Sequence, residues 1–291
     1  MQVRAPAKIN LTLRVLGKRT DGYHELESIV QMITLADLLT LDSADELTFT
    51  CSDPSLENDD NLVVRAARLL QPYNAIPRGA RINLEKRIPV RAGLGGGSSD
   101  AAAALLALNE LWEIRQPLDE LAKLAAALGS DVPFFLYTPT AIVRGRGEDV
   151  TPLPHDTLCH IVLAKPAAGL STALMYAGLR ARPYAPPRSP RPLPETQSMA
   201  RALEKDDVAA VAGALANDLE GPALVHLPEL YHIRERMLQL GALGVLLCGS
   251  GSAVFGVCPD EGTAAHAALD LTNDYRWTAH AAFCLTQGIC P

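Results

Sequence analysis

Apolar and polar residues alternate near the start of the chain. Apolar side chains occupy positions 9, 11, 13 and 15, and polar side chains occupy the positions between them, Lys8, Asn10, Thr12 and Arg14. A period of two is typical of a strand with one buried and one exposed face. The pattern therefore predicts a half-buried strand from residue 8, with Lys8 and Asn10 on its polar, solvated face.

The rest of the chain mixes strands and helices without strict alternation. Short apolar runs predict strands near 25–34, 37–42, 46–51, 81–86, 140–144, 158–164 and 276–284. Residues 245–255 predict two buried strands joined by a turn of small residues. Helical spacing predicts helices over 61–70, 98–112, 117–128, 171–179, 198–216, 228–241 and 260–271. This mixture favours an α+β fold in two lobes.

One segment, PYAPPRSPRPLP at 183–194, is too rich in proline for a regular helix or a central strand. It predicts a surface loop or spacer, and the alternative is a PxxP ligand for a partner domain. Composition alone would place a domain boundary near residue 183.

Composition excludes several classes of function. The chain has 291 residues, 48% of them hydrophobic and 20% charged, with a net charge of -7 and no lysine or arginine run. Nucleic acid is therefore not an expected partner. No apolar run has the length of a signal peptide core or a membrane span, so we expect a cytoplasmic protein with no membrane partner. Six scattered cysteines without a CxxC pair predict buried, reduced thiols and no zinc site.

A glycine-rich stretch, PVRAGLGGGSSD from residue 89, lies between a predicted strand and a predicted helix. Successive N–H groups in such a loop can converge on an anion, and Ser98, Ser99 and Asp100 are good residues to begin the helix. A helix start adds free N–H groups and a positive dipole end, as phosphate sites require. The stretch is not a Walker A loop, and Ser98 occupies the third glycine position of the dinucleotide fingerprint. From the residues alone, phosphate binding and a plain flexible loop both stay open.

With this loop the sequence resembles the superfamily of galactokinase, homoserine kinase, mevalonate kinase and phosphomevalonate kinase. Five further stretches share the resemblance: APAKINLTLRVLGKRTDGYHEL (5–26), GSDVPFFL (129–136), GRGE (145–148), NDLE (217–220) and CGSGSAVFG (248–256). The combination of AKINLTL, DGYHEL and GLGGGSS is similar to the branch that phosphorylates 4-diphosphocytidyl-2-C-methyl-D-erythritol in the non-mevalonate isoprenoid pathway.

The resemblance implies transfer of the ATP γ-phosphoryl group, with Mg²⁺ expected alongside ATP, to the 2-hydroxyl of a substrate that carries cytidine diphosphate. It also implies an N-terminal lobe like ribosomal S5 domain 2 at 1–155 and a ferredoxin-like lobe at 156–291. We expect a monomer or weak homodimer, and assign no protein ligand to a metal. The alternatives are a mevalonate or homoserine kinase-like activity and a nucleotide-binding module without turnover.

The resemblance also assigns the residues for chemistry. Asp131 matches the catalytic aspartate, although a helix start ahead of Pro133 would also explain it. Lys8 matches the catalytic lysine, whereas its pattern alone indicates a solvated side chain. A cation there could hold Asp131 ionised, lower the pKa of the attacking hydroxyl and stabilise charge moving onto the phosphoryl group.

Binding residues follow from the same resemblance. The ATP loop comprises Pro89, Val90, Arg91, Ala92, Gly93, Leu94, Gly95, Gly96, Gly97, Ser98 and Ser99. The substrate site comprises Asn10, Tyr23, His24, Tyr176, Gly249, Ser250 and Gly251. Tyr23, His24 and Tyr176 would contact the cytosine, although the residues alone favour Tyr23 and His24 as hairpin residues that pack on a sheet. Gly249 to Ser252 would lie against the glycine loop, or form a plain turn.

Arg91 departs from the family pattern, which has small residues at this point of the loop. Two interpretations follow: the side chain contacts a phosphate, or it points to solvent.

Overall fold

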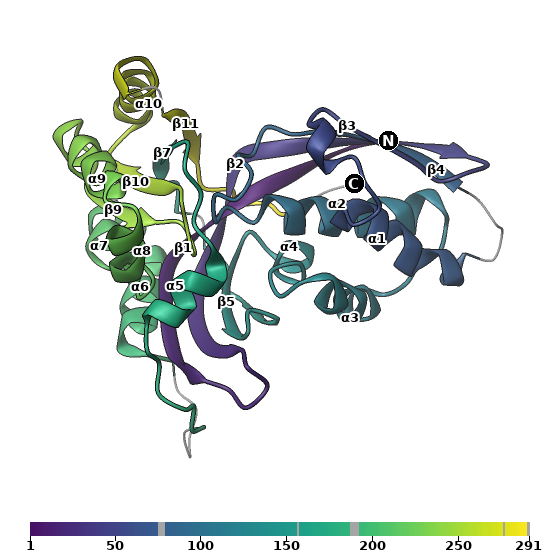
Figure 1. Cartoon of the computed structure of the whole chain (residues 1–291), viewed down its shortest axis with the longest axis horizontal. Coiled ribbons are helices and arrows are strands. Elements are labelled where there is room, and N and C mark those ends of the chain that lie inside the picture. The colour runs from purple at the N-terminus through teal and green to yellow at the C-terminus, as the bar shows by residue number, and fades with distance from the viewer. Residues whose placement is uncertain (75–78, 156, 187–191, 276, 290–291) are drawn as a thin grey trace.

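The computed structural model describes residues 1–74, 79–155, 157–186, 192–275 and 277–289, and Figure 1 shows two lobes joined by two long strands. The strands are β1 Gln2–Lys18, β2 His24–Ala44, β3 Thr48–Cys51, β4 Gly79–Glu85, β5 Thr140–Gly145, β6 Asp149–Pro152, β7 His160–Lys165, β8 Ala216–Asn217, β9 Gly244–Leu247, β10 Val254–Cys258 and β11 Thr278–Phe283. The α-helices are α1 Leu62–Leu70, α2 Gly96–Leu111, α3 Leu118–Leu128, α4 Phe134–Tyr137, α5 Thr172–Gly178, α6 Pro194–Glu204, α7 Val208–Gly213, α8 Glu220–His226, α9 Glu229–Gln239 and α10 Glu261–Tyr275.

The N-terminal sheet is built around β2. Its strand order is β3-β4-β2-β1-β8, and β5 pairs with the first part of β2 and with β6. Helices α1 to α4 cover one face of this sheet (Figure 1). The buried cluster between them is rich in alanine along α2, and small side chains bring this helix close to the strands.

An irregularity in β1 decides which way its side chains face. The pairing of β1 with β2 shifts between Pro6 and Ala7. Val3 and Ala5 pack under the helices, whereas Ala7, Ile9 and Leu11 pack against the second sheet. From residue 8 onward, the side chains that alternate with these three therefore face the junction between the lobes, where α2 begins.

The C-terminal lobe is a four-stranded antiparallel sheet in the order β11-β7-β10-β9. Alternate residues of β7 face opposite sides: Ile161 and Leu163 join β1 and β2 in one core, and Val162 and Ala164 join the helices in another. Helices α9 and α10 lie on the outer side of this sheet (Figure 1).

Two expectations about elements are corrected. Strands expected at 25–34 and 37–42 form the single strand β2, and the break between them is the same irregularity opposite Pro6 and Ala7. The helix expected at 198–216 is two helices, because Asp206 adopts a positive φ of 52° and Asp207 caps α7 by accepting from the Ala210 N–H. β6, β8, α4 and α8 were not expected from the pattern.

The proposed boundary between lobes at 155 and 156 stays a prediction. Two later segments return to the N-terminal sheet: β8 pairs in parallel with β1, and the Leu285 N–H donates to the Met32 carbonyl at 2.9 Å. Of the Pro-rich stretch, residues 187–191 lie outside the described residues. Beyond them, the buried carboxylate of Glu27 accepts from the Leu193 N–H and the Thr196 hydroxyl, which fixes the start of α6 against the sheet.

Candidate active site

The central side chains come from β1. Lys8 and Asn10 are 5% and 4% exposed, so the prediction of a solvated polar face is wrong. The burial has a structural cause that local sequence does not contain: the glycine loop and Gly249 close over this face. Lys8 Nζ donates to Asn10 Oδ1 at 2.6 Å, and Asn10 Nδ2 donates to Ser28 Oγ at 2.8 Å. This chain of hydrogen bonds fixes the lysine ammonium at the lobe junction.

Asp131 faces Lys8 from the turn after α3. That helix buries Leu121, Ala125 and Leu128 on one face and ends at Gly129. Asp131 Oδ2 lies 3.8 Å from Lys8 Nζ, and the aspartate side chain is 49% exposed while the lysine side chain is 6% exposed. The distance is that of an ion pair rather than a hydrogen bond. The carboxylate therefore has room for a further partner.

The glycine loop is held from both sides. The Lys8 N–H donates to the Leu94 carbonyl at 2.9 Å, and the Ala253 N–H donates to the Ala92 carbonyl at 3.1 Å. Gly93 has a φ of +77°, and a Cβ there would lie 1.9 Å from the Cys248 carbonyl oxygen. Only glycine permits this close approach.

Helix α2 begins earlier than the sequence predicts. Its N-cap is Gly95, in the left-handed conformation with a φ of 68°, and not one of the residues from Ser98 to Asp100. Those residues lie within the first turns of the helix instead. The free N–H groups of the helix start consequently belong to the last three glycines of the loop and to Ser98.

The turn after β9 lies against this loop. Asn217 Nδ2 donates to the carbonyls of Leu247 at 3.0 Å and Gly249 at 2.8 Å, which orients the turn. Ser250 Oγ and Thr172 Oγ1 are hydrogen-bonded at 2.8 Å across the cavity wall. Asn217 belongs to the NDLE motif, which was its only sequence signal.

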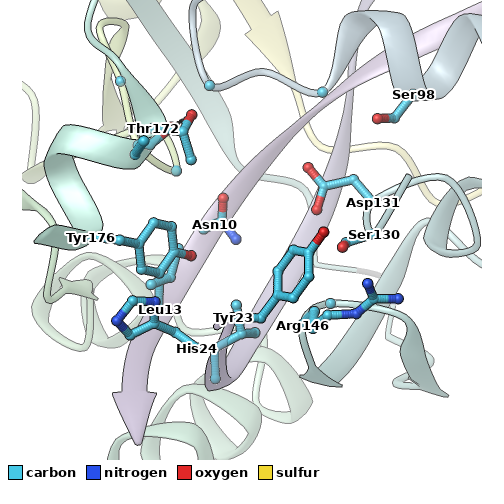
Figure 2. Close-up of a pocket in the computed structure, with 18 of the residues that line it drawn as sticks. Asn10, Leu13, Tyr23, His24, Ser98, Ser130, Asp131, Arg146, Thr172 and Tyr176 are labelled. Carbon is cyan, nitrogen blue, oxygen red and sulfur yellow. Dashed lines mark hydrogen bonds between the residues drawn. The ribbon is translucent and has the colours of Figure 1, made fainter. Parts of the chain in front are cut away.

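A cavity of about 1290 Å³ brings the predicted groups together. It is lined by the predicted residues Lys8, Asn10, Tyr23, His24, Arg91, Gly93, Gly95, Ser98, Asp131, Tyr176, Gly249, Ser250 and Gly251. Figure 2 shows Tyr176 beside His24 on one side and Tyr23 on the other, with Asp131 above them. The cavity therefore joins a charged end to an aromatic end.

The aromatic end has two parts. The rings of His24 and Tyr176 stack with centroids 4.9 Å apart and planes at 28°. Burial, with a smaller contribution from the charge of Asp131, raises the Tyr176 pKa to about 12. Desolvation and the nearby Lys18 lower the pKa of His24 below 6.5. At neutral pH the tyrosine keeps its proton and the imidazole is neutral.

Arg146 completes the opposite wall and was missed by the sequence reasoning. Its guanidinium carbon lies 4.8 Å from the centroid of the Tyr23 ring, and its Nε lies 3.3 Å from Glu148 Oε1. Figure 2 shows Arg146 beside Tyr23. A cation over the ring orients Tyr23, which is otherwise 53% exposed. The GRGE motif was the available signal.

A second cavity of about 410 Å³ lies on the other side of the glycine loop. Pro89, Val90, Ala92, Leu94, Gly96 and Gly97 line this smaller cavity, and Ser99 lines neither. Asn61, Lys86 and Asp100 also line it, and no binding role was predicted for them. Arg91, Gly93, Gly95 and Ser98 line both cavities.

Beside the smaller cavity, one buried cation meets two carboxylates. Lys86 Nζ contacts Asp37 and lies 2.8 Å from Asp100 Oδ2. Asp37 also accepts from the backbone N–H groups of Arg87 and Ile88, whereas Asp100 Oδ1 has no hydrogen-bond partner among the described residues. Desolvation raises the Asp100 pKa to about 8, opposed by Lys86 and assisted by Asp37. A proton on Asp100 therefore balances the cluster at neutral pH.

The comparisons with known proteins agree with this geometry. Residues 61–138 match the family described as GHMP kinases N terminal domain, and residues 199–276 match GHMP kinases C terminal. A 4-diphosphocytidyl-2-C-methyl-D-erythritol kinase from Geobacillus sp. (strain WCH70) is 46% identical over 88% of this chain and 87% of its own. The chain belongs to the GHMP kinase family. It is an ATP-dependent kinase with the two-lobe α+β fold of that family.

Solved structures give the same family. A crystal structure of 4-(cytidine 5'-diphospho)-2C-methyl-D-erythritol kinase is 39% identical, with a TM-score of 0.81, over 98% of this chain and 99% of that one. Homoserine kinase from Cytophaga hutchinsonii is 18% identical with a TM-score of 0.75, over 100% of this chain and 96% of that one, and shares the fold of this GHMP kinase.

Several chemical features are absent from the part of this kinase that the structure describes. That part contains no group of three or more histidine, cysteine, aspartate or glutamate side chains placed to hold a metal ion. None of its helices combines the length and apolar character needed to cross a membrane. Its five described cysteines, at 51, 159, 248, 258 and 284, are free and buried, as the sequence predicts.

Proposed function

We propose that this kinase transfers the γ-phosphoryl group of ATP to the 2-hydroxyl of 4-diphosphocytidyl-2-C-methyl-D-erythritol, in the non-mevalonate route to isoprenoids. The larger cavity supports this substrate because it joins Lys8 and Asp131 to an aromatic end within one space of about 1290 Å³. A molecule that spans it needs a hydroxyl at one end and a flat, polar-edged ring at the other. The names of the relatives agree with such a substrate.

The cytosine would bind at the aromatic end. Stacking of a base on an aromatic side chain contributes about 1–3 kcal/mol. Neutral His24 offers one donor and one acceptor nitrogen to the polar edge of the base. Tyr23, held by Arg146, supplies a second ring across the cavity from Tyr176.

ATP would bind across the glycine loop. Its adenosine fits the smaller cavity, beside Asn61 and Lys86, and its phosphates reach the N–H groups at the start of α2. The γ-phosphate then lies at the edge of the larger cavity, since Gly93, Gly95 and Ser98 line both spaces. This path places the phosphoryl group between the loop and Asp131.

Asp131 and Lys8 would carry the chemistry. As the acceptor oxygen forms its bond to the γ-phosphorus, the bond from that phosphorus to the β-bridging oxygen breaks and ADP leaves. Asp131 takes the hydroxyl proton and can pass it to water, because half of its side chain is exposed. Lys8, fixed by Asn10, stabilises the negative charge on the transferring group.

A magnesium ion would neutralise charge on the ATP phosphates. An oxygen ligand of the kind that Mg²⁺ prefers is present at the edge of the larger cavity, in the hydroxyl of Ser98. Ser98 would hold the ion, with phosphates and water as its other ligands.

The test is ADP formation by the purified chain with ATP, Mg²⁺ and one of three acceptors at equal concentration. We expect kcat/KM for 4-diphosphocytidyl-2-C-methyl-D-erythritol to exceed that for mevalonate and for homoserine by on the order of a thousandfold, because only it fills the aromatic end. Equal or faster turnover of mevalonate or homoserine would overturn the substrate assignment. ATP binding without turnover of any acceptor would overturn the kinase mechanism.

A further inference from the structure

Arg91 lies at the border between the two cavities. Arg91, Gly93, Gly95 and Ser98 line both, and Arg91 is the only charged side chain among them. Two buried cations each line one side alone: Lys8 lines the larger cavity and Lys86 the smaller. A long cation at this border can reach ligands on both sides.

Within the described residues, the Arg91 guanidinium has no carboxylate partner. Other arginines near the site pair with carboxylates: Arg144 with Glu27 at 2.9 Å and Arg146 with Glu148 at 3.3 Å. Arg91 is exposed and forms no ion pair with any carboxylate in the described ranges. An unpaired guanidinium has five N–H donors, in a fork that matches phosphate oxygens.

The backbone holds Arg91 in an unusual conformation. Its φ is 54°, in the left-handed region that costs a non-glycine residue stability. The opposite wall of the larger cavity comes near, since a Cβ built on Gly169 would lie 4.0 Å from the Arg91 Cβ. This backbone conformation and the nearby Gly169 place the base of the Arg91 side chain at the border of the two ligand sites.

We propose that Arg91 couples the two nucleotide sites by contacting phosphates of ATP and of the cytidyl substrate at the same time; this rests on the proposed function. Both ligands bring negative charge to the same border, so each would repel the other. A guanidinium shared between them reduces that repulsion only when both are bound. ATP should therefore tighten substrate binding, and the substrate should tighten ATP binding by the same factor.

The experiment measures binding of 4-diphosphocytidyl-2-C-methyl-D-erythritol by calorimetry, with Mg²⁺, in the absence and presence of a saturating β,γ-imido analogue of ATP. We expect the analogue to tighten substrate binding by about tenfold in the unmodified protein. Glycine adopts a φ of 54° without strain. In Arg91→Gly, the factor by which the analogue tightens substrate binding should therefore fall to about one. Arg91→Lys keeps the positive charge but not the forked guanidinium, so the analogue should tighten substrate binding by less than in the unmodified protein and by more than in Arg91→Gly.

Lys18→Ala is the matched control, since Lys18 is an exposed cation that lines only the larger cavity. It should weaken substrate binding equally with and without the analogue, and leave the factor near ten. An unchanged factor in Arg91→Gly, or no coupling in the unmodified protein, would overturn the role of Arg91. Failure of the unmodified protein to bind or phosphorylate the substrate would instead overturn the proposed function.

Discussion

The ammonium of Lys8 lies 3.8 Å from a carboxylate oxygen of Asp131, although the two residues come from different elements of the N-terminal lobe. The lysine is fixed by Asn10 and almost fully buried, whereas half of the aspartate side chain is exposed. A buried cation beside an accessible base suits the transfer of a proton and a phosphoryl group at one place. In the proposed mechanism, the glycine loop binds the phosphates and this pair carries out the proton chemistry.

Gly93→Ala should lower stability and weaken ATP binding together. The new Cβ would lie 1.9 Å from the Cys248 carbonyl oxygen, at a φ of +77°, so the loop must move away from the turn after β9. The left-handed backbone alone costs about 1–2 kcal/mol. Thermal unfolding and an ATP titration measure the two effects.

Gly97→Ala is the control for stability. A Cβ at Gly97 meets only the Leu62 Cδ1 atom, at an ordinary 3.8 Å, and alanine is favoured within a helix. Its Tm should equal or exceed that of the unmodified protein. Equal Tm values for both alanine variants would show that the close approach of Gly93 to Cys248 does not constrain the loop.

Substrate affinity should depend on the protonation of His24. Its pKa is lowered below 6.5, so the ring is neutral above that pH and gains a proton only in more acidic solution. Protonation removes the acceptor nitrogen that the cytosine edge requires. The substrate KM, measured at saturating ATP, should be constant above pH 6.5 and rise below it, and His24→Gln should abolish the rise. The same acidic rise in His24→Gln would assign the titration to another group.

The Asp100 cluster should make stability depend on pH. The Asp100 pKa is about 8 in the folded protein and 3.8 in its ordinary state, so the folded protein binds more protons between these values. Stability therefore falls as pH rises from about 4 to about 8. Asp100→Asn, which cannot ionise, should lose this decline.

Urea unfolding at pH 5 and pH 8.5 measures the difference. Asp119→Asn, an exposed aspartate in the first turn of α3, is the control and should keep the decline. If Asp100→Asn and the unmodified protein changed equally between the two pH values, Asp100 would be ionised throughout this range.

Features that depend on neighbouring residues in the chain could be predicted from the sequence. Alternation placed Lys8 and Asn10 on one face of a strand, and the glycines marked the loop between strand and helix. Burial of that face could not be predicted from residues 8–15, because it depends on Gly249 and on the glycine loop, which come from distant parts of the chain. For the same reason, the joining of two predicted strands into the single strand β2 could not be predicted, because it depends on the pairing with β1.

The aromatic end shows the limit more clearly. His24 and Tyr176 come from opposite lobes and stack only in the folded structure, so the family resemblance, and not a local pattern, brought them together. The GRGE motif marked Arg146 but did not predict its contact with Tyr23, because its neighbours in sequence explain only its pairing with Glu148. Side chains that meet across a cavity are specified by topology rather than by periodicity.

The most direct test of the mechanism is the single-turnover rate of phosphoryl transfer in Asp131→Asn. The amide keeps the size of the side chain but cannot take a proton, so we expect the rate to fall by about 10²–10⁴ while the Kd for ATP stays unchanged. Asp119→Asn, made in parallel, should react at the unmodified rate. A rate in Asp131→Asn equal to that of the unmodified protein would contradict the assignment of the proton transfer to Asp131.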